Sequence, residues 1–353
     1  MAADHGLTAD RPNAQVRGFL LQLVFGYMAS QVIHVAARLG IADLLGAEPT
    51  TSDALAEATS TDPSAMYRLL RGLACVGLVD ETEPGRFALT DFGTLLRADH
   101  PDSVRNLTML FCGEGVWENW GHLLDSVKTG KPVYELLHKQ RPFEVMADNP
   151  EFSEIFNEAM SEGTRQAAPG IVAAYDFSRS RTLVDVGGGD GTLLAAILSA
   201  TPGLRGILVD LPTGVATATE RLRAAGLEDR CEIVRGDFFE SVPDGADAYL
   251  MKSVIHDWDD DRASLILKNC RRAIAPNGRL LVLESVLPPK VDRSPETLGA
   301  ILVGDLNMLV SAGGRERTAK EFSALLEEAG FRLNNIVAVP PPAYVSVIEG
   351  TLA

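Results

Sequence analysis

The sequence predicts an α/β fold in its second half, a doubly wound and mainly parallel sheet, preceded by a mainly helical region. Three observations lead to this prediction. Strands and helices alternate from residue 181 onward, a glycine-rich turn joins the first of these strands to a helix, and the last strand alternates apolar with polar residues, as an antiparallel strand does. Seven strands with the last one reversed are therefore expected, rather than the six strands of a dinucleotide-binding fold.

Composition and charge narrow the function classes before any motif is considered. The 353 residues are 46 % apolar and 23 % charged, enough for two domains with a sizeable core. The formal net charge of −16 disfavours nucleic-acid binding, which needs a basic surface. No apolar run reaches the roughly 18 to 20 residues of a membrane span, and the N-terminus lacks the basic flank and apolar core of a signal peptide. A cytoplasmic protein with no nucleic-acid or membrane partner is expected.

The cysteines are scattered along the chain and form no C-x-x-C pair, so the spacing of a zinc site is absent. A disulfide framework is not expected in this compartment either. We expect reduced, structural thiols at Cys75, Cys112, Cys231 and Cys270.

The N-terminal part, residues 14–100, is predicted to be a helical domain of winged-helix type. Residues 14–46 have the pattern of two apolar helices, and the first is apolar nearly all round, so it must bury more than one face. Residues 50–98 then have the order helix, helix, hairpin. This order is compatible with DNA binding or with dimerisation, but the second helix offers only Arg68 and Arg71 as basic residues. Dimerisation, and hence a homodimer, is the favoured interpretation.

Local signals place the elements of residues 50–98. A short helix is expected at Ser52–Ala58, and a second helix begins after Asp62, an N-cap residue followed by Pro63 at the first helical position. Gly77 ends that helix. The hairpin around Pro84-Gly85 has its strands at residues 78–81 and 86–89.

Residues 101–178 are predicted to be a mainly helical linker, and residues 179–353 the sheet domain. The linker is rich in aromatic residues and methionine. A packed core is the ordinary interpretation of such residues, yet a helical layer next to a cofactor domain is also a natural wall for an aromatic ligand. The residues singled out for that wall are Trp117, Phe143, Phe156 and Met160.

The sheet domain divides into elements by its apolar runs and the turn residues between them. The strands are expected at Thr182–Val186, Gly206–Asp210, Cys231–Val234, Ala246–Val254, Arg279–Ser285, Phe331–Val339 and Tyr344–Leu352. The helices are expected to begin near Gly191, Thr213, Asp259 and Ala319.

The turn after the first strand of this sheet is the most informative segment. Its glycines, Gly187, Gly189 and Gly191, fit the pattern G-x-G-x-G, whereas a dinucleotide fingerprint would need Gly or Ala at the position of Thr192. Gly187 and Gly189 let the backbone approach a ligand closely because they have no Cβ. A strand, a tight glycine turn and a helix N-terminus together form a nucleotide-like cofactor site.

Two further strand ends extend this site. Asp210 ends the second strand, where it can accept hydrogen bonds from a ribose diol. The third strand ends in Gly-Asp-Phe-Phe, where Asp237 can accept from an adenine amino group and Phe238 can cover the ring. In this order the three features resemble the S-adenosylmethionine (SAM) site of class I methyltransferases, and they disfavour a nicotinamide or flavin.

His256 is the candidate catalytic base. Of the six histidines, it alone follows a strand of the sheet on the side expected to hold the cofactor. A lone histidine is more often structural, but this position favours catalysis. A phenol with a pKa of about 10 is a poor nucleophile until it loses its proton, and a neutral imidazole with a pKa of about 6.5 can remove that proton. No metal is expected, because the chain lacks an Asp/Asn cluster like that of magnesium-dependent catechol-type enzymes.

Two carboxylates could assist this base. Glu284 ends the fifth strand, and Glu316 lies in the loop Gly-Gly-Arg-Glu-Arg-Thr. A glutamate that accepts from one imidazole N–H fixes the tautomer and stabilises the imidazolium. The alternative for Glu316 is a surface charge paired with Arg315 or Arg317. Asn307, on an expected helix, could hold a substrate oxygen or simply be a polar residue of that helix.

Together, the winged-helix region, Val-Asp-Val-Gly-Gly-Gly-Asp-Gly, Gly-Asp-Phe-Phe, Lys-x-x-x-His-Asp-Trp and Gly-Gly-Arg-Glu-Arg-Thr resemble the plant caffeic-acid-type O-methyltransferases and the bacterial members of that family, which tailor aromatic antibiotics. The resemblance implies a class I methyltransferase core, a homodimer whose partner helices close the acceptor pocket, and His256 as general base between Glu284 and Glu316. The expected cofactor contacts are Asp185, Gly187, Gly189, Asp210, Leu211, Asp237, Phe238, Lys252, Ser253 and Met160. The expected substrate contacts are Trp117, Phe143, Phe156, Met160, Asp257, Asn307 and Met308.

The sequence therefore predicts a SAM-dependent O-methyltransferase that acts on a phenolic hydroxyl of a small aromatic, an intermediate of secondary metabolism such as an antibiotic. Methyl transfer would be in line, with His256 taking the hydroxyl proton. Two alternatives stay open: methylation of an electron-rich ring carbon, with the same histidine deprotonating a neighbouring phenol, and the use of SAM for non-methylating chemistry. A ligand-binding transcription factor is disfavoured by the acidity of the chain.

Overall fold

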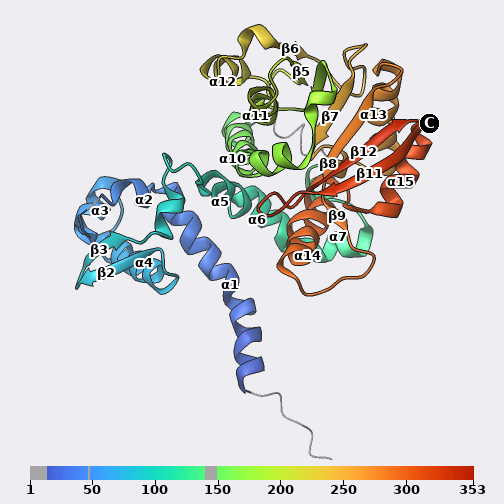
Figure 1. Cartoon of the computed structure of the whole chain (residues 1–353). Coiled ribbons are helices and arrows are strands. Elements are labelled where there is room, and N and C mark those ends of the chain that lie inside the picture. The colour runs from blue at the N-terminus through green and yellow to red at the C-terminus, as the bar shows by residue number, and fades with distance from the viewer. Residues whose placement is uncertain (1–13, 47, 140–148) are drawn as a thin grey trace, which may run out of the picture. The chain divides into compact units, whose positions relative to one another are not determined.

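The computed structural model describes residues 14–46, 48–139 and 149–353. The chain forms two compact units, Met1–Cys112 and Gly113–Ala353 (Figure 1). The first unit continues past residue 100, where the sequence places the end of the N-terminal domain, because α5 (Arg105–Phe111) packs against α1 (Ala14–Arg38).

The first unit has the predicted order of two helices followed by a hairpin. The hydroxyl of Thr51 accepts the backbone N–H of Ala54 at the start of α3 (Ser52–Thr59), and the carboxylate of Asp62 accepts that of Ala65, 2.8 Å away, at the start of α4 (Pro63–Cys75). These side-chain caps explain where both helices begin. The other elements are α2 (Ile41–Leu44), β1 (Thr50–Thr51), β2 (Val79–Glu83), β3 (Arg86–Leu89) and the 3₁₀ turn Gly93–Leu96. The strands pair in the order β1-β3-β2.

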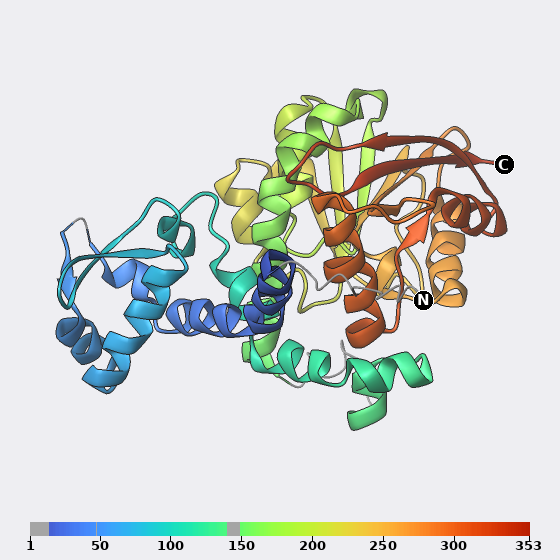
Figure 2. The same ribbon diagram turned by 90° about the horizontal axis from the view of Figure 1, so that it is seen from below.

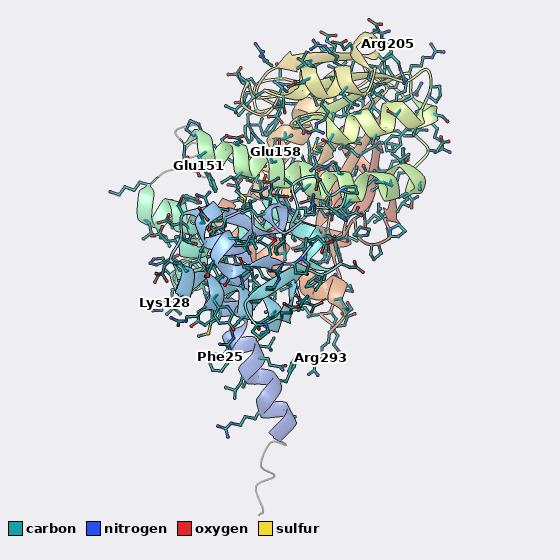
Figure 3. All side chains as sticks on the ribbon, turned by 90° about the vertical axis from the view of Figure 1, so that its left-hand side faces the viewer. Phe25, Lys128, Glu151, Glu158, Arg205 and Arg293 are labelled. Atoms are coloured by element: carbon teal, nitrogen blue, oxygen red, sulfur yellow. The ribbon has the colours of Figure 1, made fainter. Side chains whose placement is uncertain are left out.

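Helix α1 leaves its apolar side chains exposed along its first half. Phe19 is 61 % exposed and Leu23 is 63 % exposed, and Phe25 is labelled on this helix in Figure 3. Val16–Arg38 is long and apolar enough to cross a bilayer, which corrects the expectation that no stretch reaches that length. Polar residues such as Gln22 interrupt the apolar run, so the sequence analysis found no unbroken stretch of that length. The mean hydropathy of the helix nevertheless stays high enough for a membrane span. A single helix of this kind is weak evidence for a membrane span, and an exposed apolar helix face is also what a subunit interface requires.

The second unit contains the predicted seven-stranded sheet, in the order β11-β12-β8-β7-β4-β5-β6. Strand β12 is antiparallel to both of its neighbours, and the five strands from β8 to β6 are parallel to one another, so the reversed last strand is confirmed. The strands are β4 (Thr182–Val186), β5 (Arg205–Asp210), β6 (Cys231–Arg235), β7 (Ala248–Lys252), β8 (Arg279–Glu284), β11 (Phe331–Ala338) and β12 (Ser346–Leu352). Strand β7 is shorter than expected because Ser253 leaves the extended conformation at φ 54°.

Alternate residues of the strands build a separate core on each face of the sheet. On β4, Leu183 contributes to one core and Val184 to the other, as the twofold period of a strand requires. The first core contains α10 (Pro150–Ala174), α11 (Thr192–Ala200) and α12 (Ala218–Ala224), and the second contains α13 (Asp260–Ala273) and α15 (Ala319–Glu328) (Figures 1 and 2). The sheet is thus doubly wound, and the carboxyl ends of its parallel strands meet at one edge.

Shorter elements complete this unit. They are α6 (Glu114–Gly121), α7 (Leu123–Thr129), α8 (Val133–His138), α14 (Pro295–Gly299), the 3₁₀ turns Phe177–Arg179, Glu228–Arg230 and Ile255–Asp257, the two-residue strands β9 (Val286–Leu287) and β10 (Arg317–Thr318), and two π-helical stretches, Ala300–Asp305 and Met308–Ala312. The helix expected around Asn307 is confirmed, but most of it has the wider π-helical turn, a form that is often found at functional sites.

Candidate functional site

The glycine turn after β4 has a shape that only glycine allows. Gly187, Gly189 and Gly191 have φ values of 69°, 57° and 77°. A Cβ on Gly187 would lie 2.9 Å from a methyl carbon of Val254, whereas a Cβ on Gly189 would meet nothing within 4 Å. The backbone at Gly187 therefore packs closely against Val254, whereas there is free space beside Gly189. This is expected for a turn against which a ligand lies.

Two predicted carboxylates lie beneath this turn. Asp210 is held by the backbone, since its two oxygens accept the N–H groups of Gly189, 2.8 Å away, and Leu211, 2.7 Å away. Asp185 is only 2 % exposed, and its Oδ2 has no hydrogen-bond partner among the described residues. Burial, helped by the charge of Asp210, raises the pKa of Asp185 to about 7. A buried acceptor without a partner calls for a donor from outside the chain, and the ammonium and hydroxyl groups of SAM fit that need.

The Gly-Asp-Phe-Phe segment lies beside Asp210, because the N–H of Gly236 donates to the carbonyl of Asp210 over 3.0 Å. The ring of Phe238 lies over the glycine turn, 3.4 Å from the place of a Cβ on Gly187. Asp237 accepts the N–H of Phe239, which fixes the corner. Leu211, 44 % exposed, offers an apolar surface next to Asp210. The strand ends thus approach one another as the cofactor assignment requires.

Three more expected cofactor contacts border the turn. Lys252 is half-buried, its desolvation lowers the pKa of its ammonium group, and that group donates to the hydroxyl of Ser253 over 3.4 Å. Ser253 has the positive φ noted above, a strain that is often stored at functional sites. Met160 lies on α10 next to Ser161, whose hydroxyl donates to Asp190 of the glycine turn over 2.6 Å. Helix α10 is therefore tied directly to the cofactor turn.

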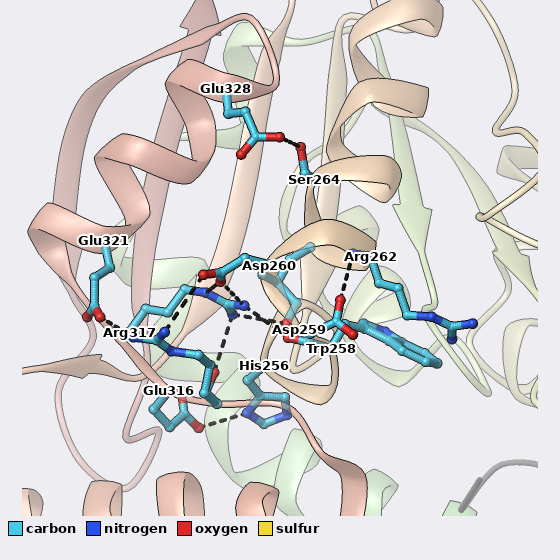
Figure 4. A network of polar contacts seen from close by, with 12 residues as sticks. His256, Trp258, Asp259, Asp260, Arg262, Ser264, Glu316, Arg317, Glu321 and Glu328 are labelled. Carbon is cyan, nitrogen blue, oxygen red and sulfur yellow. Dashed lines mark hydrogen bonds and ion pairs between the residues drawn. The ribbon is translucent and has the colours of Figure 1, made fainter. Parts of the chain in front are cut away.

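His256 lies in the short turn Ile255–Asp257 that follows β7, and both expected glutamates approach it; Figure 4 shows its contact with Glu316. Its Nδ1 is 2.8 Å from Oε1 of Glu316 and 3.4 Å from Oε2 of Glu284. Its Nε2 lies 3.7 Å from Oδ1 of Asp257. Glu284 also anchors the turn, because its Oε1 accepts the N–H groups of Val254, Ile255 and His256 at 2.9, 2.8 and 3.3 Å. The sequence alternative in which Glu316 is a surface charge is wrong, since Glu316 is 3 % exposed.

The electrostatics of this cluster differ from the sequence expectation. Burial alone would lower the pKa of His256, but the carboxylates of Glu284, Asp257 and Glu316 raise it to about 10. Burial raises the pKa of Asp257 to about 7, although His256 opposes the change, and burial also raises the pKa of Glu284. The three carboxylates therefore favour the imidazolium form of His256, whereas the sequence analysis started from the ordinary imidazole pKa of about 6.5.

The approach of Glu316 depends on two glycines that the sequence analysis did not single out for this role. A Cβ on Gly304 would lie 2.8 Å from Oε1 of Glu316, and a Cβ on Gly314 would lie 1.9 Å from the carbonyl oxygen of His256. Strand β10 follows Glu316 and pairs in parallel with β9, which follows Glu284. The two glutamates thus reach His256 from neighbouring chain segments.

The same three side chains could also hold a cation. His256, Glu284 and Glu316 each offer one ligand atom, and these atoms lie within 4.8 Å of one another. The hydrogen bond from Nδ1 to Glu316 explains the arrangement without a metal.

The substrate-side predictions fall on α6, α10 and the π-helical stretch. Asn307 is 8 % exposed, and its Oδ1 accepts the indole N–H of Trp120, 3.1 Å away, and the hydroxyl of Ser311, 3.4 Å away. The sequence analysis did not identify Trp120 as a site residue, and its position one helical turn after Trp117 is the signal that could have done so. The expected substrate contacts of Trp117, Phe156, Met160, Asp257 and Met308 stay predictions, and Phe143 lies outside the described residues.

Comparisons with known proteins match both units. The O-methyltransferase domain model matches residues 120–332, and the O-methyltransferase dimerisation domain model matches residues 21–99. O-demethylpuromycin-O-methyltransferase of Streptomyces alboniger is 41 % identical over 350 residues, which cover 98 % of this chain and 92 % of that protein. The phenazine O-methyltransferase PhzM of Lysobacter antibioticus is 42 % identical over 330 residues, 94 % of each chain. The crystal structure of LaPhzM has a TM-score of 0.90 at 40 % identity and covers 96 % of this chain and 99 % of its own.

Other relatives bear on the cofactor and the chemistry. The structure of NcsB1, an O-methyltransferase from neocarzinostatin biosynthesis, contains SAM and 2-hydroxy-5-methyl naphthoic acid; its TM-score is 0.77 at 34 % identity, over 92 % of this chain and 96 % of that one. The 8-amino-8-demethylriboflavin N,N-dimethyltransferase of Streptomyces davaonensis is 38 % identical over 90 % of each chain. Aclacinomycin 10-hydroxylase RdmB of Streptomyces purpurascens is 35 % identical over 91 % of this chain and 86 % of that protein.

The matched family and the SAM-containing solved relative confirm the fold and cofactor expected from the glycine turn and the strand ends. The chain belongs to the O-methyltransferase family, as a SAM-dependent enzyme whose O-methyltransferase domain follows the family's dimerisation domain.

Proposed function

We propose that this enzyme methylates a phenolic hydroxyl of a small aromatic intermediate of secondary metabolism, with His256 as the general base. The observation that carries the proposal is the geometry of the imidazole. Its Nδ1 lies 2.8 Å from Glu316, so Nδ1–H is the donor of that bond and the lone pair of the neutral ring is on Nε2. Nε2 is the nitrogen left to face a substrate hydroxyl.

The raised pKa of His256 defines how the proton moves. The pKa of about 10 matches that of a phenol, also about 10, so sharing one proton between Nε2 and the phenolic oxygen costs little free energy. The productive complex contains one proton fewer than an imidazolium beside a neutral phenol. Transfer of the phenolic proton to the neutral Nε2 turns this complex into a phenolate that faces an imidazolium. Glu284 and Glu316 stabilise that imidazolium, and the phenolate is the better nucleophile.

The cofactor side follows from the residues around the glycine turn. Asp185, Asp210, Asp237, Phe238 and Lys252 would hold SAM, which supplies an electrophilic methyl group when it is bound. Met160 would close the site from α10, the helix that Ser161 links to the glycine turn. Keeping both reactants on a rigid sheet edge lowers the entropic part of the barrier.

Asn307 adds a specificity element on the acceptor side. The indole N–H of Trp120 is a donor only, so the carbonyl oxygen of the Asn307 amide must face it. The amide NH₂ therefore points elsewhere, and among the described residues it has no recorded acceptor. A substrate oxygen that accepts hydrogen bonds, such as a carbonyl near the reacting hydroxyl, would complete this group.

The dimerisation domain supports a homodimer. The exposed apolar face of α1 continues into the matched dimerisation region, residues 21–99, and pairing with a second copy would cover it.

The experiment is methyl transfer from isotope-labelled SAM to a panel of phenols, naphthols and hydroxyquinones, with product analysis by mass spectrometry. His256→Asn keeps the size of the side chain but removes the base, so we expect kcat to fall by roughly 10²-fold or more while SAM affinity holds. His122→Asn is the control, because His122 is a partly exposed histidine that pairs with Asp125 and takes no part in the cluster around His256. Equal rates for His256→Asn and the parent would refute the base.

The position of the label separates the alternatives. Label on oxygen supports the proposal. Label on a ring carbon would favour C-methylation. If amines are added to the panel, label on nitrogen would favour N-methylation, the reaction in the name of the riboflavin relative. A hydroxylated product without label would favour non-methylating chemistry of the kind named for the hydroxylase relative.

A further inference from the structure

Arg317 is a buried cation next to the base, and the chemistry described so far does not use it. Its side chain is 1 % exposed, although it directly follows Glu316 in the chain. Its charge is paired with Asp260, whose Oδ1 accepts from Nε over 3.0 Å and from Nη2 over 2.8 Å (Figure 4). A guanidinium of this kind is costly to bury, so its retention needs an explanation beyond packing.

The remaining N–H groups of the guanidinium form hydrogen bonds that hold the turn carrying His256. Nη1 donates to the carbonyl oxygen of Ile255 over 3.2 Å and to that of Arg315 over 3.3 Å, and Nη2 donates to the carbonyl oxygen of Trp258 over 2.9 Å. With the two bonds to Asp260, all five N–H groups of the guanidinium have an acceptor. Two of these acceptors, Ile255 and Trp258, flank His256 on either side in the chain.

The residues before Arg317 contact the same turn. The N–H of Arg315 donates to the carbonyl oxygen of His256 over 2.8 Å, and Gly314 leaves no room for a Cβ against that carbonyl. Glu316 then accepts from the imidazole itself. One short loop therefore fixes both the backbone of His256 and the orientation of its ring, and Arg317 is the member whose side chain joins the two ends of the turn.

We propose that Arg317 is a positioning residue for the base: its guanidinium holds the turn so that Nδ1 of His256 stays in hydrogen-bond contact with Glu316. The inference rests on the proposed role of His256. It concerns geometry, because the planar five-donor fork matches carbonyl oxygens in several directions and a lysine has three donors at a single nitrogen.

The test is Arg317→Lys, which keeps the charge and loses the fork. We expect kcat to fall roughly 10- to 100-fold, since small misplacements of a catalytic group have effects of this size, whereas KM for the acceptor and the affinity for SAM should change by no more than about twofold. Arg230→Lys is the matched control, because Arg230 also donates to backbone carbonyls, those of Leu198, Thr201 and Leu204. Arg230 lies just before the first residue of β6, whereas the Gly-Asp-Phe-Phe segment follows the last residue of that strand. Arg230→Lys should lower thermal stability and leave kcat unchanged.

A double-mutant cycle with Glu316→Ala, which removes the acceptor for Nδ1–H, identifies the route of the effect. If Arg317 acts by keeping His256 against Glu316, Arg317→Lys should cost no more than about threefold in kcat once the side chain of Glu316 has been removed. Full additivity of the two changes would overturn the proposal. An unchanged kcat in Arg317→Lys with a lowered melting temperature would also overturn it, since the role would then be structural only.

Two further measurements keep the proposal testable. If Arg317→Lys does not fold, Asp260→Asn loosens the guanidinium while Arg317 remains, and a smaller fall in kcat with unchanged KM is expected. In the protein labelled with ¹⁵N-histidine, the Nδ1–H proton of His256 should be strongly deshielded and should lose that shift in Arg317→Lys but not in Arg230→Lys. This signal is independent of turnover, so it would still report on positioning if His256 proved not to be the base.

Discussion

The bond between His256 and Glu316 makes a quantitative prediction for Glu316→Gln. Glutamine keeps an acceptor oxygen for Nδ1–H, 2.8 Å away, and removes the negative charge. A hydrogen bond to a charged partner contributes about 1.5–3 kcal/mol and a neutral one about 0.5–1.5 kcal/mol, so the charge contributes about 1–1.5 kcal/mol. That difference corresponds to about one pKa unit of His256.

The sign of the shift follows from which form is stabilised. Glu316 favours the imidazolium and contributes to the raised pKa of about 10, so its neutralisation favours the neutral base. The rising limb of kcat/KM against pH should move to lower pH by about one unit, and the rate above that limb should fall up to roughly 10-fold because the imidazolium is less stabilised in the transition state. The rising limb describes the coupled cluster of His256 with Asp257 and Glu284 rather than one isolated residue.

The assay is the initial rate of S-adenosylhomocysteine formation between about pH 6 and pH 11, the range that brackets histidine and phenol. Glu321→Gln is the matched control: this glutamate caps α15, where glutamine can keep the capping box. Its profile should overlay that of the parent. A rising limb that stays in place in Glu316→Gln, or moves to higher pH, would refute the assignment of Glu316 as the stabilising partner of His256.

Three other predictions can be checked independently. Burial raises the pKa of Asp185 to about 7 in the folded protein, above the unfolded value of about 3.9, so the folded state loses stability as the pH rises from the lower to the higher value. Asp185→Asn should therefore raise the Tm of the SAM-free protein at pH 8 but not at pH 4, and it should weaken SAM binding. An equal shift of Tm at both pH values would contradict this prediction. Leu20→Lys combined with Phe25→Lys, at positions 60 % and 51 % exposed on α1, should convert a dimer to a monomer in analytical ultracentrifugation, and an unchanged mass would exclude this face as the interface. Removal of divalent cations with a chelator should leave kcat within about twofold, as expected for acid–base catalysis; a loss that a metal ion restores would make the cluster of His256, Glu284 and Glu316 a metal site.

Much of the architecture follows from local patterns in the sequence. The glycine turn needs positive φ values at Gly187, Gly189 and Gly191, so its position and shape are encoded in the residues themselves. The alternation of strands and helices fixes the sheet, and the reversed β12 is visible in its apolar–polar alternation. Because parallel strands end at one edge, the sequence also places Asp210 beside the Gly-Asp-Phe-Phe segment.

Tertiary structure decided the features that depend on residues far apart in the chain. Glu316 is 60 residues from His256, and Trp120 is 187 residues from Asn307, so no local pattern shows that these side chains meet. The hydrogen bonds from Arg317 to the turn likewise form only once β10 has paired with β9. The same holds for the close packing that excludes a Cβ at Gly304 and Gly314. The pKa of His256 belongs to the same class. Residue type sets a value of about 6.5, and the three carboxylates that folding brings around a buried imidazole raise it, because in a low-dielectric interior charge interactions depend on distance and burial rather than on order in the sequence.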